Sequence, residues 1–505
     1  MAEQPNIIMI LCDELRADAL GCYGNPIVDT PNIDRLATKG TLFDQCMVTQ
    51  PTCTPSRASI LTGCYPSAIR SRMVGCYTPD DSRFLPRILA QNGYHTASIG
   101  KLHLVPQSAE PDVIIDRMQS DDGTYYGFQE VNLVNGHGDK CFGSQYMEWL
   151  QARVPDLAER LERRQPYLHG VNTYTWELPE DVHSSNYIAD RTIEFLERDH
   201  EGAFFLHVSF PDPHYPFTVP EPYASRYHPD DMPSPIPPVS ESDRMPPLHT
   251  QVYERQNTAP IRPDGKPVDR IIGTPPHVYS SYSVKDWQQV KATYYGMVSL
   301  LDDCIGRILN TIEQLDMMEN TIIVFLSDHG DYLGDHGFYG KGLPYDSVLR
   351  VPMIWTGAGI EAGASINSVE STLDITPTLL NLANIAEPEA MQGLSLKTTL
   401  YGESQNRRSI AMTENDDDFA AIRMRTITTE SWRLTYYLNE NFGELIDRHN
   451  DPQEMHNLWG NPDYSIIQQD LLNQLMSEIL ASIDMVNGRK QQPSAPIPKW
   501  REALE

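Results

Sequence analysis

NIIMILCD, residues 6–13, is an unbroken apolar run that ends at an acid. The run is too short for a helix and lacks the alternation of a half-exposed strand, so it predicts a strand that is buried on both faces. Similar short runs recur at residues 95–100, 203–210, 321–327 and 351–355. These segments predict the strands of one sheet.

Helical patterns lie between the predicted strands. Thr30 and Pro31 start a segment that ends at Gly40, and residues 186–198 and 284–315 carry apolar side chains at helical spacing. Strands that alternate with helices predict a doubly wound α/β domain, in which helices flank a mixed, mainly parallel sheet. Ligands of such domains gather at the carboxyl ends of the strands.

Two later regions depart from this pattern. Residues 211–276 are rich in proline and charge, which predicts a surface insertion. Residues 420–428 and 431–437 resemble antiparallel strands, and residues 466–483 resemble an amphipathic helix. The apolar face of that helix consists of Ile467, Leu471, Leu475, Ile479 and Leu480.

These regions predict two domains and a tail. Residues 1–402 form the α/β domain with its insertion, and residues 403–486 form a small C-terminal α+β domain. The proline-rich segment at residues 487–505 is an extended tail, either a linker or an arm onto a neighbouring subunit.

The composition has a strong acidic excess. The 505 residues include 39 Lys and Arg against 69 Asp and Glu, so the formal net charge is −30. A field of this sign repels nucleic acids and anionic membranes, and we expect neither as a partner. In such a chain, an anionic substrate requires locally clustered cations.

Neither a membrane span nor a signal peptide is expected. No apolar run approaches the ~18 residues that a transmembrane helix needs, and the first residues lack the basic segment of a signal peptide. We therefore expect a cytoplasmic protein. The eight cysteines lack the spacing of a disulfide-rich domain and, apart from Cys53, are expected to be small apolar residues of the core.

Acidic and imidazole side chains follow two of the predicted strands. Asp13 and Glu14 end the first strand, and Asp328 and His329 follow residues 321–327. Taken singly, such acids cap helices or face water about as often as they bind an ion. Two such groups at strand ends of one sheet favour an oxygen-rich site for a divalent cation.

Another motif places a thiol at the start of a helix. The motif is Cys53-Thr54-Pro55-Ser56-Arg57, and Pro55 suits the first turn of a helix, so Cys53 is expected at its positive end. There we expect the pKa of the thiol to fall. Arg57 follows one helical turn later and can reach the same site. On its own, a cysteine beside a proline is more often structural.

The order of several motifs resembles that of the sulfatase family, within the alkaline phosphatase superfamily. The Cys-x-Pro-Ser-Arg motif at Cys53 matches the signature of that family. Further matching segments follow in register along nearly the whole chain: Gly100-Lys101-Leu102-His103-Leu104, Pro213-His214, Ser327-Asp328-His329-Gly330, Gly340-Lys341, Gly443-Glu444-Leu445-Ile446-Asp447 and Asp451-Pro452. The resemblance implies an alkaline phosphatase-like fold and a sulfuric ester hydrolase.

The resemblance also implies the cofactors. A separate formylglycine-generating enzyme oxidises the cysteine of the family signature to Cα-formylglycine, whose hydrate attacks the sulfur atom with one hydroxyl group and releases sulfate through the other. One divalent metal ion is implied, with ligands from Asp13, Glu14, Cys53, Asp328 and His329. Calcium is favoured, and manganese is the alternative because an imidazole ligand suits it better than an amide oxygen.

Five further residues receive roles from the resemblance. Arg57 contacts the nucleophile and the metal, and Lys101 and Lys341 neutralise the sulfuryl oxygens. His103 orients the hydrate and accepts a proton, and His214 contacts the substrate and helps to protonate the leaving group. A single lysine is usually a solvated surface residue, and for Lys341 this alternative stays open.

Two positions differ from the common pattern of the family. Many sulfatases have two adjacent aspartates where this chain has Asp13 and Glu14, so Glu14 either binds the ion or lies just outside its ligands. Many have Asp-Asn where this chain has Asp328 and His329, and the Asp-His pair resembles the choline sulfatases and phosphonate monoester hydrolases. That resemblance favours a homo-oligomer, either a dimer or a tetramer.

Three functions are compatible with these observations. The first is an arylsulfatase-like hydrolase of small-molecule sulfate esters. The second is a phosphonate monoester hydrolase or phosphodiesterase with the same nucleophile, because sulfuryl and phosphoryl groups differ little in size and charge. The third is a non-catalytic homologue that binds a metal ion, in which Cys53 stays a thiol.

Overall fold

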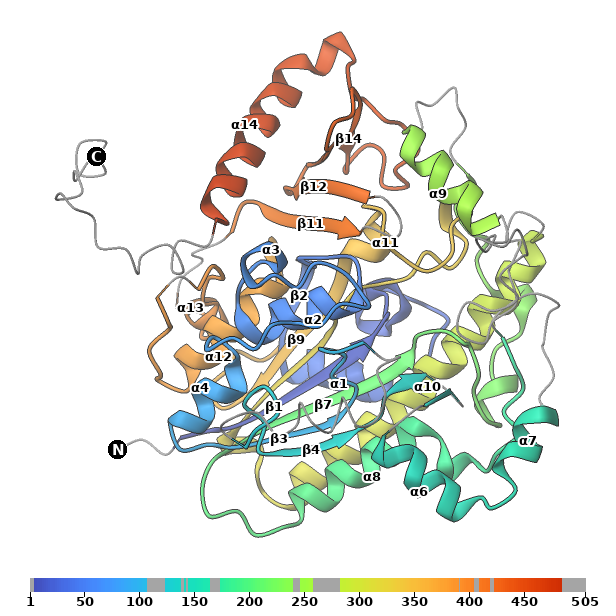
Figure 1. Ribbon diagram of the computed structural model, residues 1–505, viewed down its shortest axis with the longest axis vertical. Helices are drawn as coiled ribbons and strands as arrows, with labels where there is room; N and C mark the ends of the chain where they lie inside the picture. The colour runs from blue at the N-terminus through green and yellow to red at the C-terminus, as the bar shows by residue number, and fades with distance from the viewer. Residues whose placement is uncertain are drawn as a thin grey trace.

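The fold of the chain is seen in a computed structural model (Figure 1). The structure describes residues 4–106, 123–137, 140–141, 144–163, 173–238, 246–257, 282–389, 391–403, 408–417 and 422–483. These residues form a large α/β domain and a smaller C-terminal domain.

A mixed eight-stranded sheet forms the centre of the larger domain, in the order β10-β2-β9-β8-β1-β7-β3-β4. β9 runs antiparallel to its neighbours β2 and β8, and the other pairings in this sheet are parallel. The strands are β1 (Asn6–Asp13), β2 (Gly40–Met47), β3 (His95–Gly100), β4 (Glu130–Leu133), β7 (Phe204–Pro213), β8 (Thr321–Ser327), β9 (Arg350–Gly357) and β10 (Ala364–Ser371). The predicted mixed, mainly parallel sheet is confirmed, and β2, β4 and β10 join the five strands that the sequence indicated.

β1 shows why the apolar runs form buried strands. Ile8 and Ile10 belong to one hydrophobic cluster, whereas Ile7 and Met9 belong to another. Since successive side chains of a strand point to opposite faces, both faces of β1 contact apolar neighbours. The lack of polar alternation in the sequence therefore reflects helices on both sides of the sheet.

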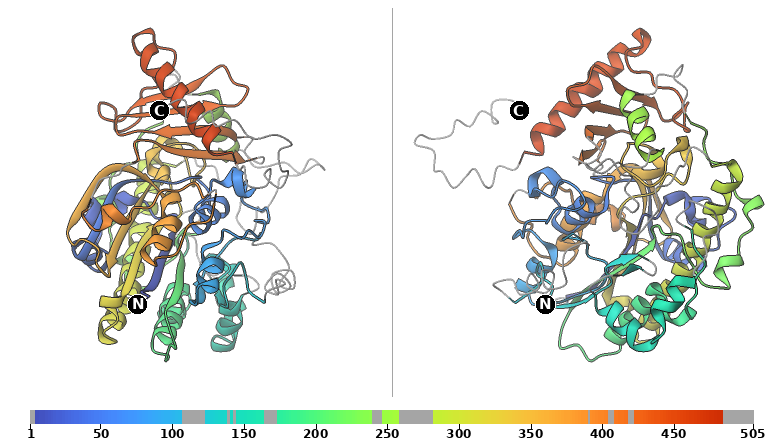
Figure 2. Two further views of the ribbon diagram at one scale, coloured as in Figure 1. Left: turned by 90° about the vertical axis from the view of Figure 1, so that its left-hand side faces the viewer. Right: turned by 45° about the vertical axis from the view of Figure 1, so that its right-hand side comes forward.

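Helices cover the two faces of the sheet (Figures 1 and 2). One face is covered by α1 (Pro31–Lys39), α6 (Gln145–Arg153), α7 (Leu157–Arg163), α8 (Ser184–Leu196) and α10 (Val284–Gln314). The other face is covered by α2 (Cys53–Thr62), α3 (Pro66–Ile69), α4 (Leu85–Gln91), α12 (Ile375–Leu382) and α13 (Lys397–Leu400). Short 3-10 helices lie at Ala17–Ala19, Gly21–Tyr23, Glu180–Val182, Tyr223–Ser225, Pro229–Asp231, Met318–Asn320, Asp335–Gly337, Thr372–Asp374 and Pro462–Tyr464.

The parallel strands bring their carboxyl ends to one edge of the sheet. β8, β1, β7 and β3 are neighbours that run in the same direction. β1 ends at Asp13, and the other three strands lead directly into Asp328, His214 and Lys101. These four side chains therefore start from the same edge, where ligands of such sheets bind.

The C-terminal domain is a four-stranded antiparallel sheet with one long helix. Its elements are β11 (Ala411–Asp417), β12 (Ile422–Thr428), β13 (Trp432–Tyr437), β14 (Gly443–Asp447) and α14 (Ser465–Ala481). In Figures 1 and 2 it lies against the end of the larger domain that carries α2 and α3. α9 (Pro247–Asn257) and α11 (Asp346–Leu349) pack against β12 and β13 in a separate hydrophobic cluster.

The predicted apolar face of the last helix is partly wrong. Leu471 and Leu475 are buried against the C-terminal sheet, and Ile467 and Ile479 pack beside them. Leu480 is 63% exposed, because it lies on the outward face of α14. Apolar residues on both faces of this helix hid the buried face in the sequence pattern.

The predicted surface insertion does not start where expected. β7 continues through Pro213, so residues 211–213 belong to the central sheet. Residues 247–257 form α9, and residues 258–281 lie outside the described residues. The short hairpin of β5 (Gly136–His137) and β6 (Lys140–Cys141) is a second local addition. The predicted tail, residues 487–505, also lies outside the described residues.

Most of the described cysteines lie in the core as expected, whereas Cys22 and Cys76 are only half-buried. Among the cysteines whose side chains the structure describes, none forms a disulfide. Those that are buried are Cys12, Cys46, Cys53, Cys64 and Cys304. Within the described ranges, no helix combines the length and the apolar content of a membrane span.

Candidate active site and metal centre

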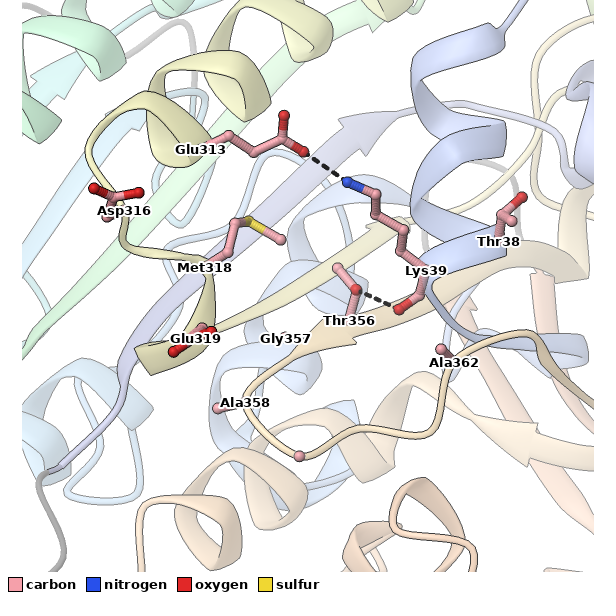
Figure 3. Close-up of a pocket in the computed structure, with 11 residues that line it drawn as sticks. Thr38, Lys39, Glu313, Asp316, Met318, Glu319, Thr356, Gly357, Ala358 and Ala362 are labelled. Atoms are coloured by element: carbon pink, nitrogen blue, oxygen red, sulfur yellow. Dashed lines mark hydrogen bonds and ion pairs between the residues drawn. The ribbon is translucent and has the colours of Figure 1, made fainter.

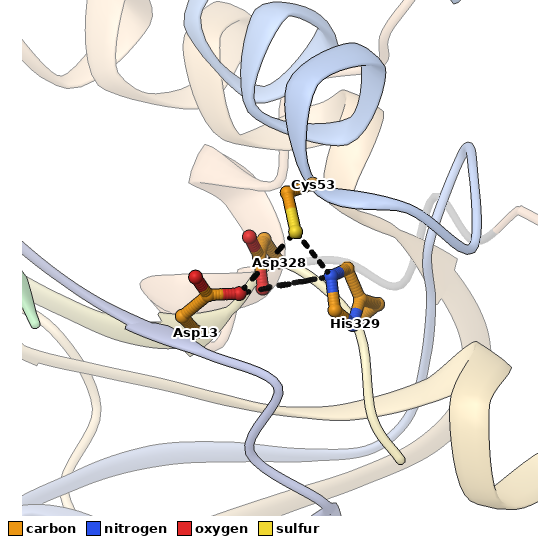
Figure 4. Close-up of side chains that lie close together, drawn as sticks. All are labelled: Asp13, Cys53, Asp328 and His329. Atoms are coloured by element: carbon orange, nitrogen blue, oxygen red, sulfur yellow. Dashed lines mark hydrogen bonds and ion pairs between the residues drawn. The ribbon is translucent and has the colours of Figure 1, made fainter. Parts of the chain in front are cut away.

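Four side chains converge where β1, β8 and α2 meet (Figure 4). Asp13 ends β1, and Asp328 and His329 follow the neighbouring strand β8, with Cys12 paired to Ser327. α2 brings Cys53 to the same point as its first residue. One ligand atom from each of the four lies within 4.8 Å of the others, and all four residues are buried.

The donor set fits a divalent cation. It offers two carboxylates, an imidazole and the side chain of residue 53. His329 Nδ1 donates to the Gly330 carbonyl at 3.0 Å, which leaves Nε2 directed at the cluster. Burial lowers the pKa of His329, so the ring stays neutral and keeps its lone pair for a metal.

A basic side chain binds one oxygen of each carboxylate. Lys101 Nζ forms an ion pair with Asp13 Oδ2, and Arg57 Nε donates to Asp328 Oδ2 at 2.6 Å. The Oδ1 atoms face the cluster: that of Asp13 lies 3.6 Å from Cys53 Sγ, and that of Asp328 lies 3.6 Å from His329 Nε2. The basic residues thus hold both carboxylates in place while one oxygen of each can bind an ion.

The Cys53 thiol differs from the sequence prediction. It lies 3.1 Å from His329 Nε2 at the start of α2. Burial raises its pKa to about 12, and the negative charge of Asp13 adds to the rise. The expected fall of the pKa at the helix terminus is therefore wrong, because desolvation and a neighbouring carboxylate outweigh the helix. Residue 53 is a poor thiolate nucleophile in this environment.

Arg57 connects three segments beneath the metal centre. Its Nη1 donates to the Lys101 carbonyl and to Ser209 Oγ, both at 2.8 Å. Its Nη2 lies 3.7 Å from Asp13 Oδ2. Since Arg57 is almost completely buried, its planar guanidinium fixes the relative positions of α2, β3 and β7.

Lys101 and His103 follow β3. Gly100 has a φ of +107°, and a Cβ at this position would collide with the Ser209 carbonyl, so the turn after β3 requires glycine. The turn directs Lys101 to Asp13. His103 is 7% exposed and has a left-handed backbone with a φ of 55°.

Glu14 lies beside the cluster of four ligand residues. Its carboxylate lies 3.1 Å from Lys341 Nζ and 3.1 Å from His214 Nε2. Its main-chain N–H donates to Asp328 Oδ1 at 3.1 Å. Burial raises the pKa of Glu14 to about 8, although the positive charge of Lys341 opposes the rise. Glu14 thus connects the metal centre to the two residues predicted to bind substrate.

Three neighbouring residues received no role from the sequence. Asp331 is fully buried, and desolvation raises its pKa to about 6. The ring of Tyr215 packs against that of His214 at a tilt of 30° with centroids 4.2 Å apart, and Lys341 Nζ lies 5.7 Å from the centre of the Tyr215 ring. Ser209 accepts a hydrogen bond from Arg57. Asp331 lies two residues after His329 and so beside the predicted ligands in the sequence, whereas no pattern distinguishes Ser209 or Tyr215.

A cavity also lies near the opposite edge of the sheet (Figure 3). It has a volume of about 930 Å³ and is lined by residues at the end of α1, the end of α10 and the turn after β9. Lys39 on its wall is paired with Glu313 at 2.9 Å. The lining carries the carboxylates of Glu313, Asp316 and Glu319 but no histidine or cysteine, so it lacks the imidazole and the thiol that the cluster at the carboxyl edge provides.

Comparisons with known proteins cover almost the whole chain. The family model described as "Sulfatase" matches residues 5–385. The model described as "N-sulphoglucosamine sulphohydrolase, C-terminal" matches residues 334–480.

Curated relatives and solved structures agree with these matches. An arylsulfatase of Clostridium perfringens is 29% identical over 470 residues, which is 91% of each chain. An N-acetylglucosamine-6-O-sulfatase of Bacteroides thetaiotaomicron is 27% identical over 94% of this chain and 86% of its own. The structure of a phosphonate monoester hydrolase of Agrobacterium radiobacter superimposes with a TM-score of 0.81 and 26% identity, over 95% of this chain and 97% of its own.

Proposed function

The chain belongs to the sulfatase family, and on this premise we propose that it hydrolyses small-molecule sulfate monoesters with a formylglycine made from Cys53 and one divalent metal ion. One observation carries the proposal. Cys53 begins a buried helix within hydrogen-bonding distance of His329 and beside Asp13, so nucleophile and metal ligands share one centre.

The metal ion is proposed to bind at the cluster of four. Asp13, Asp328 and His329 supply the protein donors, and the side chain of residue 53 supplies another. Mostly oxygen donors favour calcium, and the imidazole of His329 makes manganese the alternative. Glu14 is the remaining proposed ligand, through a change of rotamer away from Lys341. When bound, the ion polarises the nucleophile and the sulfuryl group.

The raised pKa of the Cys53 thiol supports formylglycine, rather than a thiolate, as the nucleophile. The buried thiol is not activated for direct attack. A formylglycine-generating enzyme is proposed to convert it to the aldehyde. The hydrate of that aldehyde supplies one hydroxyl group for attack on sulfur and a second whose deprotonation releases sulfate.

The surrounding cations meet the charge of the substrate. Lys341 and His214 both contact the Glu14 carboxylate beside the centre. A sulfuryl group bound there would displace or share these contacts with Glu14. Lys341 neutralises oxygen charge in the transition state, and His214 helps to protonate the leaving alcohol. These local cations offset the repulsion that a net charge of −30 exerts on an anionic substrate.

The remaining residues position the nucleophile. Arg57 and Lys101 hold Asp328 and Asp13, respectively, through the contacts described above. The proposed effect of Lys101 on the sulfuryl oxygens is therefore transmitted in part through Asp13. His103, buried beside the end of β3, is proposed to accept the proton that sulfate release requires.

Mass spectrometry of the peptide that contains Cys53 tests the nucleophile. Protein produced with a formylglycine-generating enzyme is expected to lose about 18 Da at Cys53, the difference between thiol and aldehyde side chains. Cys53→Ala is expected to abolish turnover and keep the fold. Full activity with an unmodified thiol would overturn the mechanism, and unchanged activity of Cys53→Ala would favour a non-catalytic role of the site.

A phosphonate monoester hydrolase is the second candidate. The superposition on such an enzyme, with a TM-score of 0.81, favours it. The same nucleophile and metal accept phosphonate monoesters and phosphodiesters, because the transferred groups are alike in shape. Values of kcat/KM for an aryl sulfate, a phenyl phosphonate ester and an aryl phosphodiester decide between the two. We expect the sulfate to be preferred, and a higher value for the phosphonate would reverse the assignment.

A further inference from the structure

Two loops that are far apart in the sequence reach the active site. Residues 50–52 lead into Cys53, and Thr52 Oγ1 donates to Gln50 Oε1 at 2.9 Å. In the second loop, Lys341 is followed by Gly342, whose carbonyl faces the C-terminal domain. Neither the order of the sequence nor the central sheet joins these loops, because one precedes α2 and the other follows β8.

Asn415 of β11 binds both loops at once. Its Oδ1 accepts a hydrogen bond from Gln50 Nε2 at 3.1 Å, and its Nδ2 donates to the Gly342 carbonyl at 2.8 Å. The side chain is fully buried. Neighbouring residues of β11 reinforce the contact with the first loop, since Glu414 N donates to the Thr49 carbonyl at 2.8 Å.

The loop around Lys341 needs such support. Gly340 and Gly342 both have positive φ angles, of 73° and 121°, so Lys341 lies between two residues with wide conformational freedom. The Gly340 carbonyl accepts from Tyr332 N at 2.9 Å on one side of Lys341. Asn415 holds the carbonyl on the other side. The amide therefore restricts the backbone that carries Lys341.

We propose that Asn415 is a positioning residue through which the C-terminal domain sets the distance between the side chain of residue 53 and Lys341. The inference rests on the proposed function, in which Lys341 stabilises charge on the group that the nucleophile attacks. The C-terminal sheet is then part of the catalytic apparatus, although it supplies no group that touches the substrate. A shift of about 1 Å between reacting groups costs up to about a hundredfold in rate, so one buried amide is sufficient for this role.

Asn415→Ala removes both hydrogen bonds, and Asn415→Asp keeps the acceptor for Gln50 but loses the donor to Gly342. We expect kcat to fall at least about tenfold in both, with a change in KM below about threefold, because Lys341 acts mainly in the transition state. Thr426→Val is the matched control. Thr426 is equally buried in the adjacent strand β12, and its hydroxyl pairs with Thr435 inside the C-terminal sheet.

Two readouts separate positioning from loss of stability. Thermal unfolding is expected to shift to a similar extent in Asn415→Ala and Thr426→Val, but only the Asn415 variants should lose kcat. Hydrogen exchange of the amides at residues 340–343 should become faster in the Asn415 variants and not in Thr426→Val. If Asn415→Ala does not fold, Asn415→Asp and Gln50→Ala carry the test.

The outcomes distinguish this inference from the proposed function. If the wild-type protein turns over no ester, the proposed function fails, while the exchange measurement still tests whether Asn415 holds the loop. If the wild type is active and the Asn415 variants lose no more kcat than Thr426→Val, the positioning role is wrong. Unchanged exchange at residues 340–343 would also overturn it.

Discussion

Asp328 contacts three other parts of the site. Its carboxylate accepts hydrogen bonds from Arg57 Nε and from the Glu14 main chain, and its Oδ1 lies near His329. Asp328→Ala removes a proposed metal ligand and leaves the buried Arg57 guanidinium with only the more distant Asp13 carboxylate, 3.7 Å from Nη2. We expect metal content, measured by inductively coupled plasma mass spectrometry, to fall to background and turnover to fall at least about a thousandfold.

A control separates this effect from general loss of a buried acid. Asp374 is fully buried and paired with Arg408, away from the carboxyl ends of β1 and β8. Asp374→Asn is expected to lower the thermal midpoint and keep the metal. Retained turnover in metal-stripped Asp328→Ala would show that the ion has been placed at the wrong site.

Arg57 tests whether geometry or charge matters at the centre of the site. Its guanidinium binds Asp328, Ser209 and a main-chain carbonyl at once, which a lysine ammonium cannot do in the same plane. Arg57→Lys keeps the charge and is expected to lower kcat/KM on the order of a hundredfold. Steady-state kinetics measure the loss, and a value near that of the wild type would show that charge alone is sufficient.

Single residues were predicted well where a motif names them and less well where burial decides their chemistry. The four residues Asp13, Cys53, Asp328 and His329 were all singled out, and the structure brings them together. The pKa of Cys53 was predicted in the wrong direction, because the helix terminus is visible in the sequence but the desolvation by the surrounding core is not.

At the scale of elements, helix α1 starts on a carboxylate from a distant helix. Asp302 of α10 accepts hydrogen bonds from Ile33 N at 2.8 Å and from Asn32 N at 3.1 Å, both in the first turn of α1. Burial nevertheless raises the pKa of Asp302 to about 6. The ionised form is therefore less favourable in the folded protein than in the unfolded chain.

The sign of the resulting pH dependence follows from that shift. The folded-state pKa of about 6 exceeds the usual value of 3.8, so the contribution to stability is present below pH 3.8 and is lost as pH rises through 6. We expect the thermal midpoint of the wild type, relative to that of Asp302→Asn, to fall between about pH 4 and pH 7. Scanning calorimetry of both proteins measures the difference, and a constant difference would contradict the burial effect.

Strand boundaries followed the sequence closely, whereas the last helix did not. β1, β3 and β8 have the predicted bounds because their apolar runs end at a charged residue or a turn. α14 carries apolar residues on its buried and exposed faces, with Ile466 85% exposed. Periodicity alone could not tell which face packs on the C-terminal sheet.

At the scale of the molecule, the net charge of −30 opposes the approach of an anionic ester. Raising NaCl from about 20 mM to about 200 mM shortens the screening length roughly threefold. We expect kcat/KM for an anionic aryl sulfate to rise roughly twofold over this range, while kcat at saturation stays constant. Chloride is used because sulfate is the proposed product.

The direction of the salt effect is informative. Repulsion by the whole molecule predicts a rise, whereas dominance of the local cations Lys101 and Lys341 and the bound metal predicts a fall. Kinetics at several ionic strengths measure it. A steady decrease of kcat/KM with salt would show that the field at the site is already attractive at long range.

The sequence by itself determined the mainly parallel sheet, the Cys53 motif and the strand ends that carry the acids. Those features are local, because each is a short run whose length, apolar content or turn chemistry limits the backbone. The sequence also determined the family resemblance through motifs that keep their order along the chain.

Tertiary structure alone decided how those residues act on one another. Glu14 contacts Lys341 and His214, and Lys101 binds Asp13. Asn415 joins Gln50 and Gly342, which are 292 residues apart in the sequence. Such contacts cross sheet and domain boundaries, and the protonation of the groups depends on how deeply the surrounding core buries them. Contact between residues that are distant in the sequence, and depth of burial, are properties of the folded molecule, and no local pattern encodes them.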